Sequence, residues 1–239
     1  MFRRISLLKS LRARLTLGVT EPFGHADYPL AETMRYRGDP GLFGPESVTW
    51  QVIGDVAAFV GGVRALVVQA AHPEVAAGVS DHSSYRNDPL GRLSRTSAYV
   101  TATSYGALPE VEQAIEIVRG AHGPVRGASP RGRRYSASTP EYAAWVHNAL
   151  TDSFLAAYQR YGRRPLSAGD ADRFVAEQTQ LGSRLSAAPL PDTAAGLASW
   201  VANHPAAAPS PGMHEALSFL RRPPLPRSQL IGYRLLFHA

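Results

Sequence analysis

The sequence contains no cysteine, and Lys9 is the only lysine among its 25 basic residues. The lack of cysteine excludes disulfides, iron–sulfur clusters and thiolate metal sites, so a metal would have to be bound by histidine or carboxylate. The positive charge is carried almost entirely by arginine, whose planar guanidinium suits carboxylate and phosphate partners. These arginines are scattered, and most aromatic residues lie in apolar periodic segments, which argues against a nucleic-acid-binding protein.

Long hydrophobic runs are also missing. The most apolar window, residues 52–71, is interrupted by Asp55, Arg64 and Gln69, which indicates a buried helix and not a membrane span. Residues 1–17 mix basic and apolar residues without the unbroken apolar core of a secretory signal. They predict a basic amphipathic helix that packs on the domain or lies on an anionic membrane surface. We therefore expect a cytoplasmic protein, with residues 1–17 as the candidate for peripheral membrane contact.

Alternating strand patterns and internal repeats are scarce, whereas helical periodicity dominates the chain. We expect residues 1–44 to form a basic helix and a loop rich in proline and glycine, and residues 45–239 to form one all-α domain. Ser47 is expected to cap one helix that continues to the segment before His72-Pro73. Thr139, Ser167 and Asp192 are expected to cap later helices.

An arginine-rich segment is the first candidate binding site. Arg92, Arg95 and Thr96 stand at positions i, i+3 and i+4, so they share one face if residues 90–104 are helical. Such a face can bind an anionic ligand that also has an apolar body. The alternative is a solvated helix side whose arginines pair with nearby acids.

Common catalytic signatures are missing as well: the chain has no glycine-rich phosphate loop after a strand, no Gly-x-Ser-x-Gly and no His-Glu-x-x-His. His122 and His147 each continue the apolar stripe of an expected helix. Either one is a hydrogen-bonded core residue or an axial ligand of haem, which needs one imidazole, an apolar slot and cations for its propionates. A nonhaem metal site is less favoured, because Asp152 follows His147 at a spacing that suits a helix poorly.

Several short motifs occur in an order and spacing that resemble the family of mpaB-type oxygenases and latex clearing proteins (rubber oxygenases). The motifs are Gly62-Val63-Arg64-Ala65-Leu66, His72-Pro73, Gly78-Val79, His82-Ser83, Asp88-Pro89, Gly91-Arg92-Leu93-Ser94-Arg95-Thr96, His122-Gly123-Pro124-Val125-Arg126-Gly127, Tyr135-Ser136-Ala137 and Trp145-Val146-His147. The resemblance covers roughly residues 45–185 and implies a globin-like helical core that holds haem b.

The resemblance implies roles for single residues. His122 is similar to the proximal iron ligand, while Arg92, Arg95 and Thr96 resemble the distal Arg-x-x-Lys-Thr element of latex clearing proteins. Arg95 stands where that element has lysine, and a protonated guanidinium has no lone pair to donate to iron. His147 stays the rival axial ligand, and Arg64 is a further candidate for cofactor binding.

These observations predict a haem b-dependent oxygenase, with iron on His122, that acts with dioxygen on a hydrophobic, unsaturated, isoprenoid-like small molecule. The alternative is a noncatalytic helical protein that binds haem or a lipid, peripheral to a membrane. Residues 235–239 lie in an expected helix without a C-cap signal, as in a frayed end or a shortened member of the family.

Overall fold

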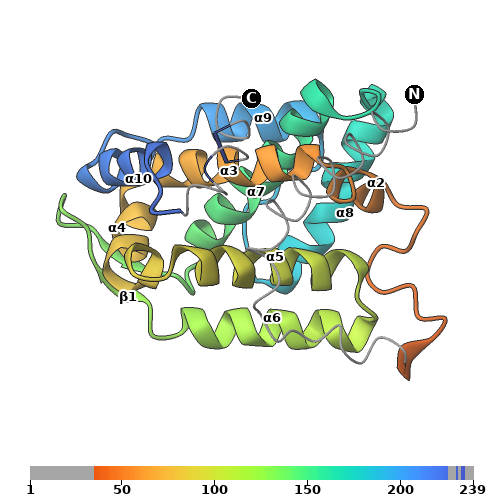
Figure 1. The fold of residues 1–239 in the computed structure, drawn as a ribbon, viewed down its shortest axis with the longest axis horizontal. Coiled ribbons are helices and arrows are strands. Elements are labelled where there is room, and N and C mark those ends of the chain that lie inside the picture. The colour runs from red at the N-terminus through yellow and green to blue at the C-terminus, as the bar shows by residue number, and fades with distance from the viewer. Residues whose placement is uncertain (1–34, 226–229, 231–232, 235–239) are drawn as a thin grey trace, which may run out of the picture.

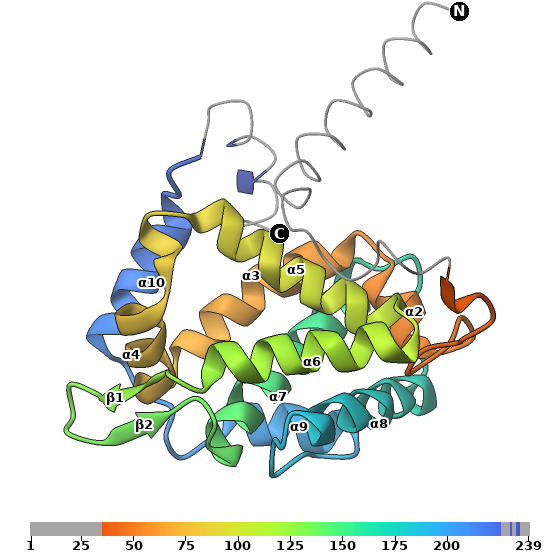
Figure 2. The same ribbon diagram turned by 90° about the horizontal axis from the view of Figure 1, so that it is seen from below.

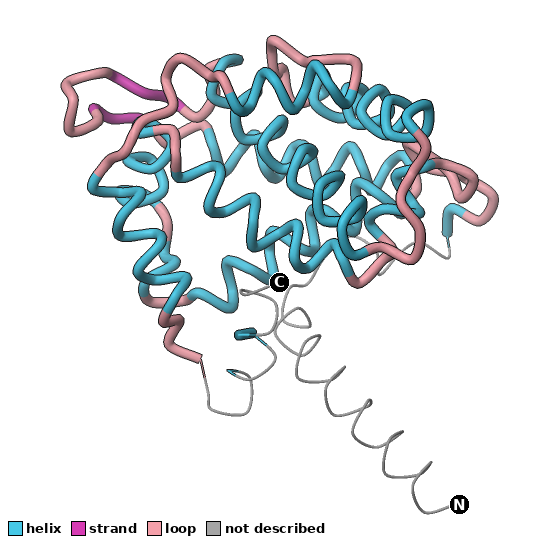
Figure 3. The backbone as a smooth tube through the Cα atoms, turned by 90° about the horizontal axis from the view of Figure 1, so that it is seen from above, coloured by secondary structure: helices cyan, strands magenta, loops and turns pink. Residues whose placement is uncertain are grey.

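The computed structural model describes residues 35–225, 230 and 233–234. This part of the chain is mostly helical, which confirms the all-α prediction, and Figure 3 shows its strands in one small hairpin. The elements are α2 (Val48–Ile53), α3 (Ala57–Ala70), α4 (Pro73–His82), the 3-10 turn η3 (Ser84–Arg86), α5 (Pro89–Tyr105), α6 (Leu108–His122), β1 (Arg126–Ala128), β2 (Arg134–Ser136), α7 (Pro140–Tyr161), α8 (Ala168–Arg184), α9 (Ala194–Ala202) and α10 (Pro211–Arg221).

The single helix predicted after Ser47 is in fact two helices. Ser47 caps α2 as expected, because its Oγ accepts a hydrogen bond from the Trp50 amide at 3.1 Å. α2 ends at Gly54, and α3 starts after Asp55, whose Oδ1 accepts a hydrogen bond from the Ala57 amide at 2.9 Å. The continuous helix was wrong because glycine weakens a helix and an aspartate side chain competes for backbone amides.

Contact between α3 and α7 forms the centre of the fold (Figure 1). Gly61 lets the two backbones approach, since a Cβ there would lie 2.8 Å from Phe154 Cδ1 and 3.1 Å from the Ser153 oxygen. Further along the pair, Trp145 Nε1 donates a hydrogen bond to the Gln69 carbonyl at 3.1 Å. The close approach leaves no room for a side chain at position 61.

α8 and α9 cover another side of α7, and α2 closes the end of this layer. The main core that results contains Val48, Val52, Trp145, Phe154, Leu155, Tyr158, Leu166, Ala171, Phe174, Val175, Leu197 and Val201. Glu177 on α8 joins α2 to the core, because its carboxylate accepts hydrogen bonds from the Val48 and Thr49 amides at 3.2 and 2.7 Å. A carboxylate at the N-terminus of a helix is stabilised by the helix dipole.

Two helices joined by a short turn, α5 and α6, lie against this centre. They run antiparallel around Gly106-Ala107, and Figures 1 and 2 both show them side by side. Asp88 caps α5 through a 2.9 Å hydrogen bond from the Gly91 amide to its Oδ1. Glu110 Oε2 accepts a hydrogen bond from the Ala107 amide at 2.8 Å and so fixes the start of α6. In Figure 2 the two helices diverge from this turn, and α3 is seen between their far ends.

The β1–β2 hairpin was not predicted. Arg126 pairs with Ser136, Gly127 with Tyr135 and Ala128 with Arg134 in an antiparallel register. With three residues in each strand, the segment is too short to show the alternation that a strand prediction needs.

The positions at which helices begin were predicted more closely than the side chains that cap them. Ser167 accepts a hydrogen bond from the Asp170 amide at 3.1 Å, as expected. Thr139 stands at the predicted N-cap of α7, but its side chain makes no capping hydrogen bond. α9 is capped by Thr193, one residue after the predicted Asp192.

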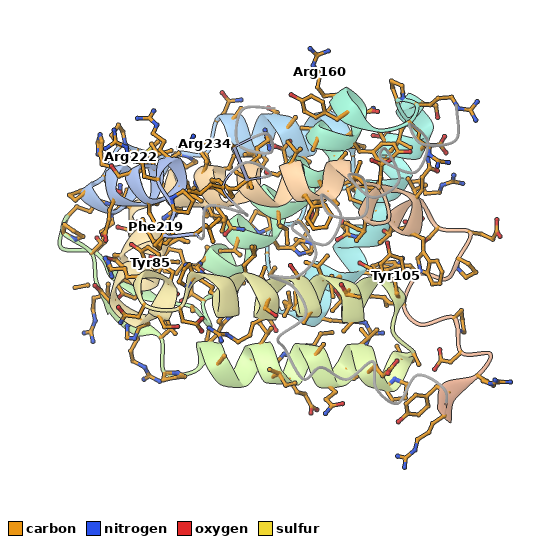
Figure 4. The ribbon with its side chains drawn as sticks, in the orientation of Figure 1. Tyr85, Tyr105, Arg160, Phe219, Arg222 and Arg234 are labelled. Atoms are coloured by element: carbon orange, nitrogen blue, oxygen red, sulfur yellow. The ribbon has the colours of Figure 1, made fainter. Side chains whose placement is uncertain are left out.

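α10 packs on α3 and α4. In Figure 4 Phe219 on α10 lies next to Tyr85, and their rings meet edge to face at 5.1 Å between centroids. Glu215 on α10 also pairs with Arg86 of η3 at 2.5 Å. These contacts join the last described helix to the segment that precedes α5.

Some expectations fall outside the described residues: the basic helix at 1–17, most of the following loop, and residues 235–239. In the part of the chain that is described, no helix has both the length and the apolar character needed to cross a bilayer. The globin-like character of the core and the division at residues 44 and 45 stay predictions.

Candidate functional site

The arginine segment forms the first part of α5, as the spacing predicts. Its members face different surroundings: Arg92 is half-buried, whereas Arg95 and Thr96 are exposed. Residue spacing had placed all three on one face, and the structure separates them by burial. Arg92 is therefore the inner member of the set.

Arg92 lies over an aromatic ring, with its guanidinium carbon 5.7 Å from the centroid of Tyr85. Burial lowers the pKa of this guanidinium below its usual value, although it stays protonated. Among residues 35–225, no hydrogen bond or ion pair to its side chain is found. A half-buried cation without a carboxylate is stabilised by an anionic ligand.

Arg95 is held on the outside of α5. Its Nη1 lies 3.3 Å from Asp88 Oδ2, and its Nη2 donates a hydrogen bond to Ser84 Oγ at 3.4 Å. The hydroxyl of Thr96 donates to the Arg92 carbonyl at 3.0 Å. Both side chains thus have local partners in this structure, and an exposed pair such as Arg95–Asp88 is released at little cost.

His122 is the last residue of α6, and its imidazole makes no hydrogen bond within the described chain. The residue is exposed, yet burial of the ring by surrounding protein lowers its pKa. A lowered pKa favours the neutral imidazole, which is the form that binds a metal.

The other candidate iron ligand, His147, is part of the packed interior. It is buried in α7, and its Nε2 donates a hydrogen bond to the Gln178 carbonyl of α8 at 2.9 Å. Burial lowers its pKa to about 4. A Cβ at Gly182 would lie 2.9 Å from the same nitrogen, so α8 closes off this edge of the ring.

Arg64 pairs with α7. Its Nη1 lies 2.7 Å from Asp152 Oδ2 and donates a hydrogen bond to Ser153 Oγ at 2.7 Å. The side chain of Asp152 is only 11% exposed, so this pair compensates a carboxylate that is almost buried. Arg64 and Asp152 join α3 to α7.

Arg92 and His122 are brought to one end of the α5–α6 pair. Since the helices run antiparallel from Gly106-Ala107, the start of α5 and the end of α6 lie at the same end, where Figure 2 shows the helices apart. The structure does not bring His147 or Arg64 into this pair, because both contact α7 or α8 partners.

α3, seen between the far ends of α5 and α6 in Figure 2, carries apolar side chains that are partly exposed. A helix that is apolar on all sides is usually buried, but several large side chains of α3 are only half-buried. They are Phe59, Val60, Val63, Leu66 and Val67. Together with the imidazole of His122 and the half-buried guanidinium of Arg92, these residue types match what haem needs, which is one imidazole, apolar contacts and cations for its carboxylates.

Two side chains near Arg92, those of Tyr85 and Ser94, were not predicted from the sequence. Tyr85 lies beneath the guanidinium, but it belongs to a short irregular segment without periodicity. Ser94 is buried, and its hydroxyl has no hydrogen-bond partner in the described residues. Its place between Arg92 and Arg95 was the only sequence signal, and a serine in a helix carries little information by itself.

Within the described residues, no three histidine, aspartate or glutamate side chains gather in a group able to hold a metal ion. That finding concerns sites built from several protein ligands, whereas porphyrin iron needs one axial side chain.

Comparison with known proteins gives one positive finding. The family model described as ER-bound oxygenase mpaB/B'/Rubber oxygenase, catalytic domain, matches residues 50–238. No curated protein and no solved structure matches the chain.

Proposed function

Because the chain belongs to the mpaB/rubber oxygenase catalytic-domain family, we propose that it is a haem b-dependent oxygenase acting on a hydrophobic, unsaturated, isoprenoid-like small molecule. The family supports an oxygenase that uses dioxygen on a small-molecule substrate. Haem, the iron ligand and the substrate class are the proposed parts. When bound, haem would supply the iron at which dioxygen is activated.

The observation that carries this proposal is the imidazole of His122 at the end of α6, which makes no hydrogen bond within the described residues and whose pKa is lowered by burial. We propose that His122 would bind the iron, because His147 donates its Nε2 hydrogen to the Gln178 carbonyl and lies against Gly182. An axial histidine needs an unprotonated nitrogen, which the lowered pKa of His122 favours.

Arg92 is proposed to bind the anionic edge of the cofactor. Its guanidinium is held over Tyr85, has no carboxylate partner in the described chain, and matches a propionate in shape and charge. Arg95, which pairs with Asp88 in this structure, and Thr96 are proposed as hydrogen-bond donors that would stand beside the bound haem and its dioxygen. Arg95 keeps its proton, so it acts as a hydrogen-bond donor where relatives with lysine have a potential ligand.

The half-buried apolar side chains of α3 are proposed to contact the macrocycle and the substrate. Arg64, paired with Asp152, would support this helix from behind. Peripheral membrane contact through residues 1–17 belongs to the same proposal and lies outside the described residues.

The test is an absorbance spectrum of the full-length protein loaded with haem, reduced, and treated with carbon monoxide. We expect a Soret band that His122→Ala abolishes. His82→Ala, a substitution of another exposed histidine, should leave the band unchanged. A protein that takes up no haem, or a band that survives His122→Ala, would contradict the proposal.

A second candidate is a noncatalytic protein that binds haem or a lipid, favoured by the same apolar sides of α3. An oxygen electrode separates the two functions. Haem-loaded protein that consumes no oxygen with a panel of isoprenoids and reductants would favour the noncatalytic one.

A further inference from the structure

A second candidate site lies at the β1–β2 hairpin, which Figure 2 shows at one end of the molecule beside α4. An open pocket of about 320 Å³ lies between the hairpin and the beginning of α7. The residues around it are Arg126, Arg134, Tyr135, Ser136, Thr139 and Tyr142. Among the described residues, two cations and no carboxylate therefore border one hollow, together with the hydroxyl-bearing residues Ser136 and Thr139.

The register of the hairpin places both arginines on one face. Arg126 is opposite Ser136 and Arg134 is opposite Ala128, while the pair between them, Gly127 and Tyr135, occupies the other face. Side chains alternate along a strand, so Arg126 and Arg134 are diagonal neighbours across the two strands. The pocket is bordered by this face.

Tyr135 fixes which face points away from the fold. Its hydroxyl donates a 2.6 Å hydrogen bond to Asp81 Oδ2 on α4, and burial together with this bond raises its pKa to about 12. The ring covers Gly127 so closely that a Cβ there would lie 2.5 Å from the phenolic oxygen. Because Tyr135 is anchored inward, the arginine face is held outward.

The two arginines differ from a third one in the same hairpin. Arg131, in the turn, donates to Glu74 Oε1 at 2.6 Å and is neutralised by that buried carboxylate. Arg126 donates to the Gly123 carbonyl at 3.0 Å, and neither Arg126 nor Arg134 pairs with a carboxylate among the described residues. Their positive charge is therefore not compensated within this part of the chain.

The start of α7 adds to the positive electrostatic potential of the pocket. Thr139 is its N-cap residue, and its side chain makes no capping hydrogen bond, which leaves the hydroxyl available to a ligand. The N-terminus of a long helix carries partial positive charge. Hydroxyl donors beside paired guanidinium groups match the oxygens of a phosphate.

We infer that this pocket binds a phosphomonoester dianion through Arg126 and Arg134. The group is either a soluble phosphate or the headgroup of an acidic lipid, and both present the same oxygens. The inference does not depend on haem or on His122.

Binding is tested on the full-length protein by calorimetric titration with inorganic phosphate. The variant Arg126→Gln/Arg134→Gln should bind phosphate about tenfold more weakly or worse, since charge-assisted hydrogen bonds are lost. The control Arg163→Gln/Arg164→Gln removes the same charge from two exposed arginines outside the pocket and should bind like the original protein. Thermal unfolding checks that both variants are folded.

Vesicles of phosphatidylcholine with and without phosphatidic acid identify the source of the group. Vesicle binding that needs phosphatidic acid and is lost in Arg126→Gln/Arg134→Gln, but not in the control, supports a lipid headgroup. Phosphate binding without vesicle binding supports a soluble phosphate. Binding of neither probe, or equal weakening in both double variants, overturns the inference.

Discussion

The guanidinium carbon of Arg92 lies 5.7 Å from the ring centroid of Tyr85, and no carboxylate pairs with this arginine in the described chain. The ring attracts the cation without neutralising it. Arg92 is thereby held in place for an anion, whereas Arg95, three residues later, already has Asp88.

Replacing Arg92 by methionine should therefore weaken haem binding by about tenfold or more, because a charge-assisted contact with a propionate is lost. The measurement is an absorbance titration with haem. Arg95→Met is the matched control from the same helix and should have a smaller effect. A larger effect of Arg95→Met would assign the propionate to Arg95.

Two adjacent glycines of α3 should respond in opposite directions to alanine. Gly61→Ala is expected to destabilise the haem-free protein by about 1–3 kcal/mol, because its Cβ would meet the α7 backbone. A Cβ at Gly62 would have no described atom of another element within 4 Å, so Gly62→Ala should stabilise the helix by up to about 1 kcal/mol. Urea denaturation measures both, and equal effects would argue against the close α3–α7 contact.

Removing Arg64 should destabilise the protein because its partner Asp152 is then left unpaired. Arg64→Met leaves the nearly buried carboxylate of Asp152 without a counter-charge, with an expected loss of about 1–3 kcal/mol. Adding Asp152→Asn should restore part of that loss, since the unpaired charge is then gone. A double variant whose loss equals the sum of the two single losses would show that the pair is not coupled.

Stability should fall in acid in two separable stages. Burial lowers the pKa of His72 from 6.5 to about 4. Below pH 6.5 this histidine therefore becomes protonated in the unfolded chain while it stays neutral in the folded chain. In this stage the free energy of unfolding can fall by up to about 3 kcal/mol between pH 6.5 and 4. His147 is expected to add to it, because its pKa is lowered in the same way.

The second stage comes from Glu74. Burial raises the pKa of its carboxyl, but hydrogen bonds from Arg131 and Ser129 outweigh burial and bring it to about 2. Its contribution is complete above pH 4.5 and is lost as the pH falls toward 2. Urea denaturation at a series of pH values measures both stages. His72→Phe should reduce the first stage to the part that His147 contributes and leave the second stage, and an unchanged pH profile would refute the assignment.

Local signals predicted much of this fold. Ser47 and Ser167 begin helices where expected because capping depends on residues a few positions apart. The break at Gly54 and the hairpin at 126–136 were missed, since the first needs a balance between neighbouring helices and the second has strands of three residues. Helix existence was therefore easier to predict than helix limits.

The candidate site was only partly accessible from the sequence. The resemblance pointed to His122 and Arg92, but the commitment of His147 to the Gln178 carbonyl is a contact between residues on two different helices. The pairing of Arg95 with Asp88 depends on side-chain conformations that spacing does not determine. The sequence indicated the residue types of the candidate site, and packing decides which of their side chains have no partner among the described residues.

The buried carboxylate of Glu74 also affects the order in which the chain can fold. Its partners Ser129 and Arg131 lie 55 and 57 positions further along the chain. Until the ribosome has released both, the first turn of α4 carries an acidic group that favours contact with water over docking. We therefore expect α4 to reach its final place late in synthesis, after the hairpin has emerged.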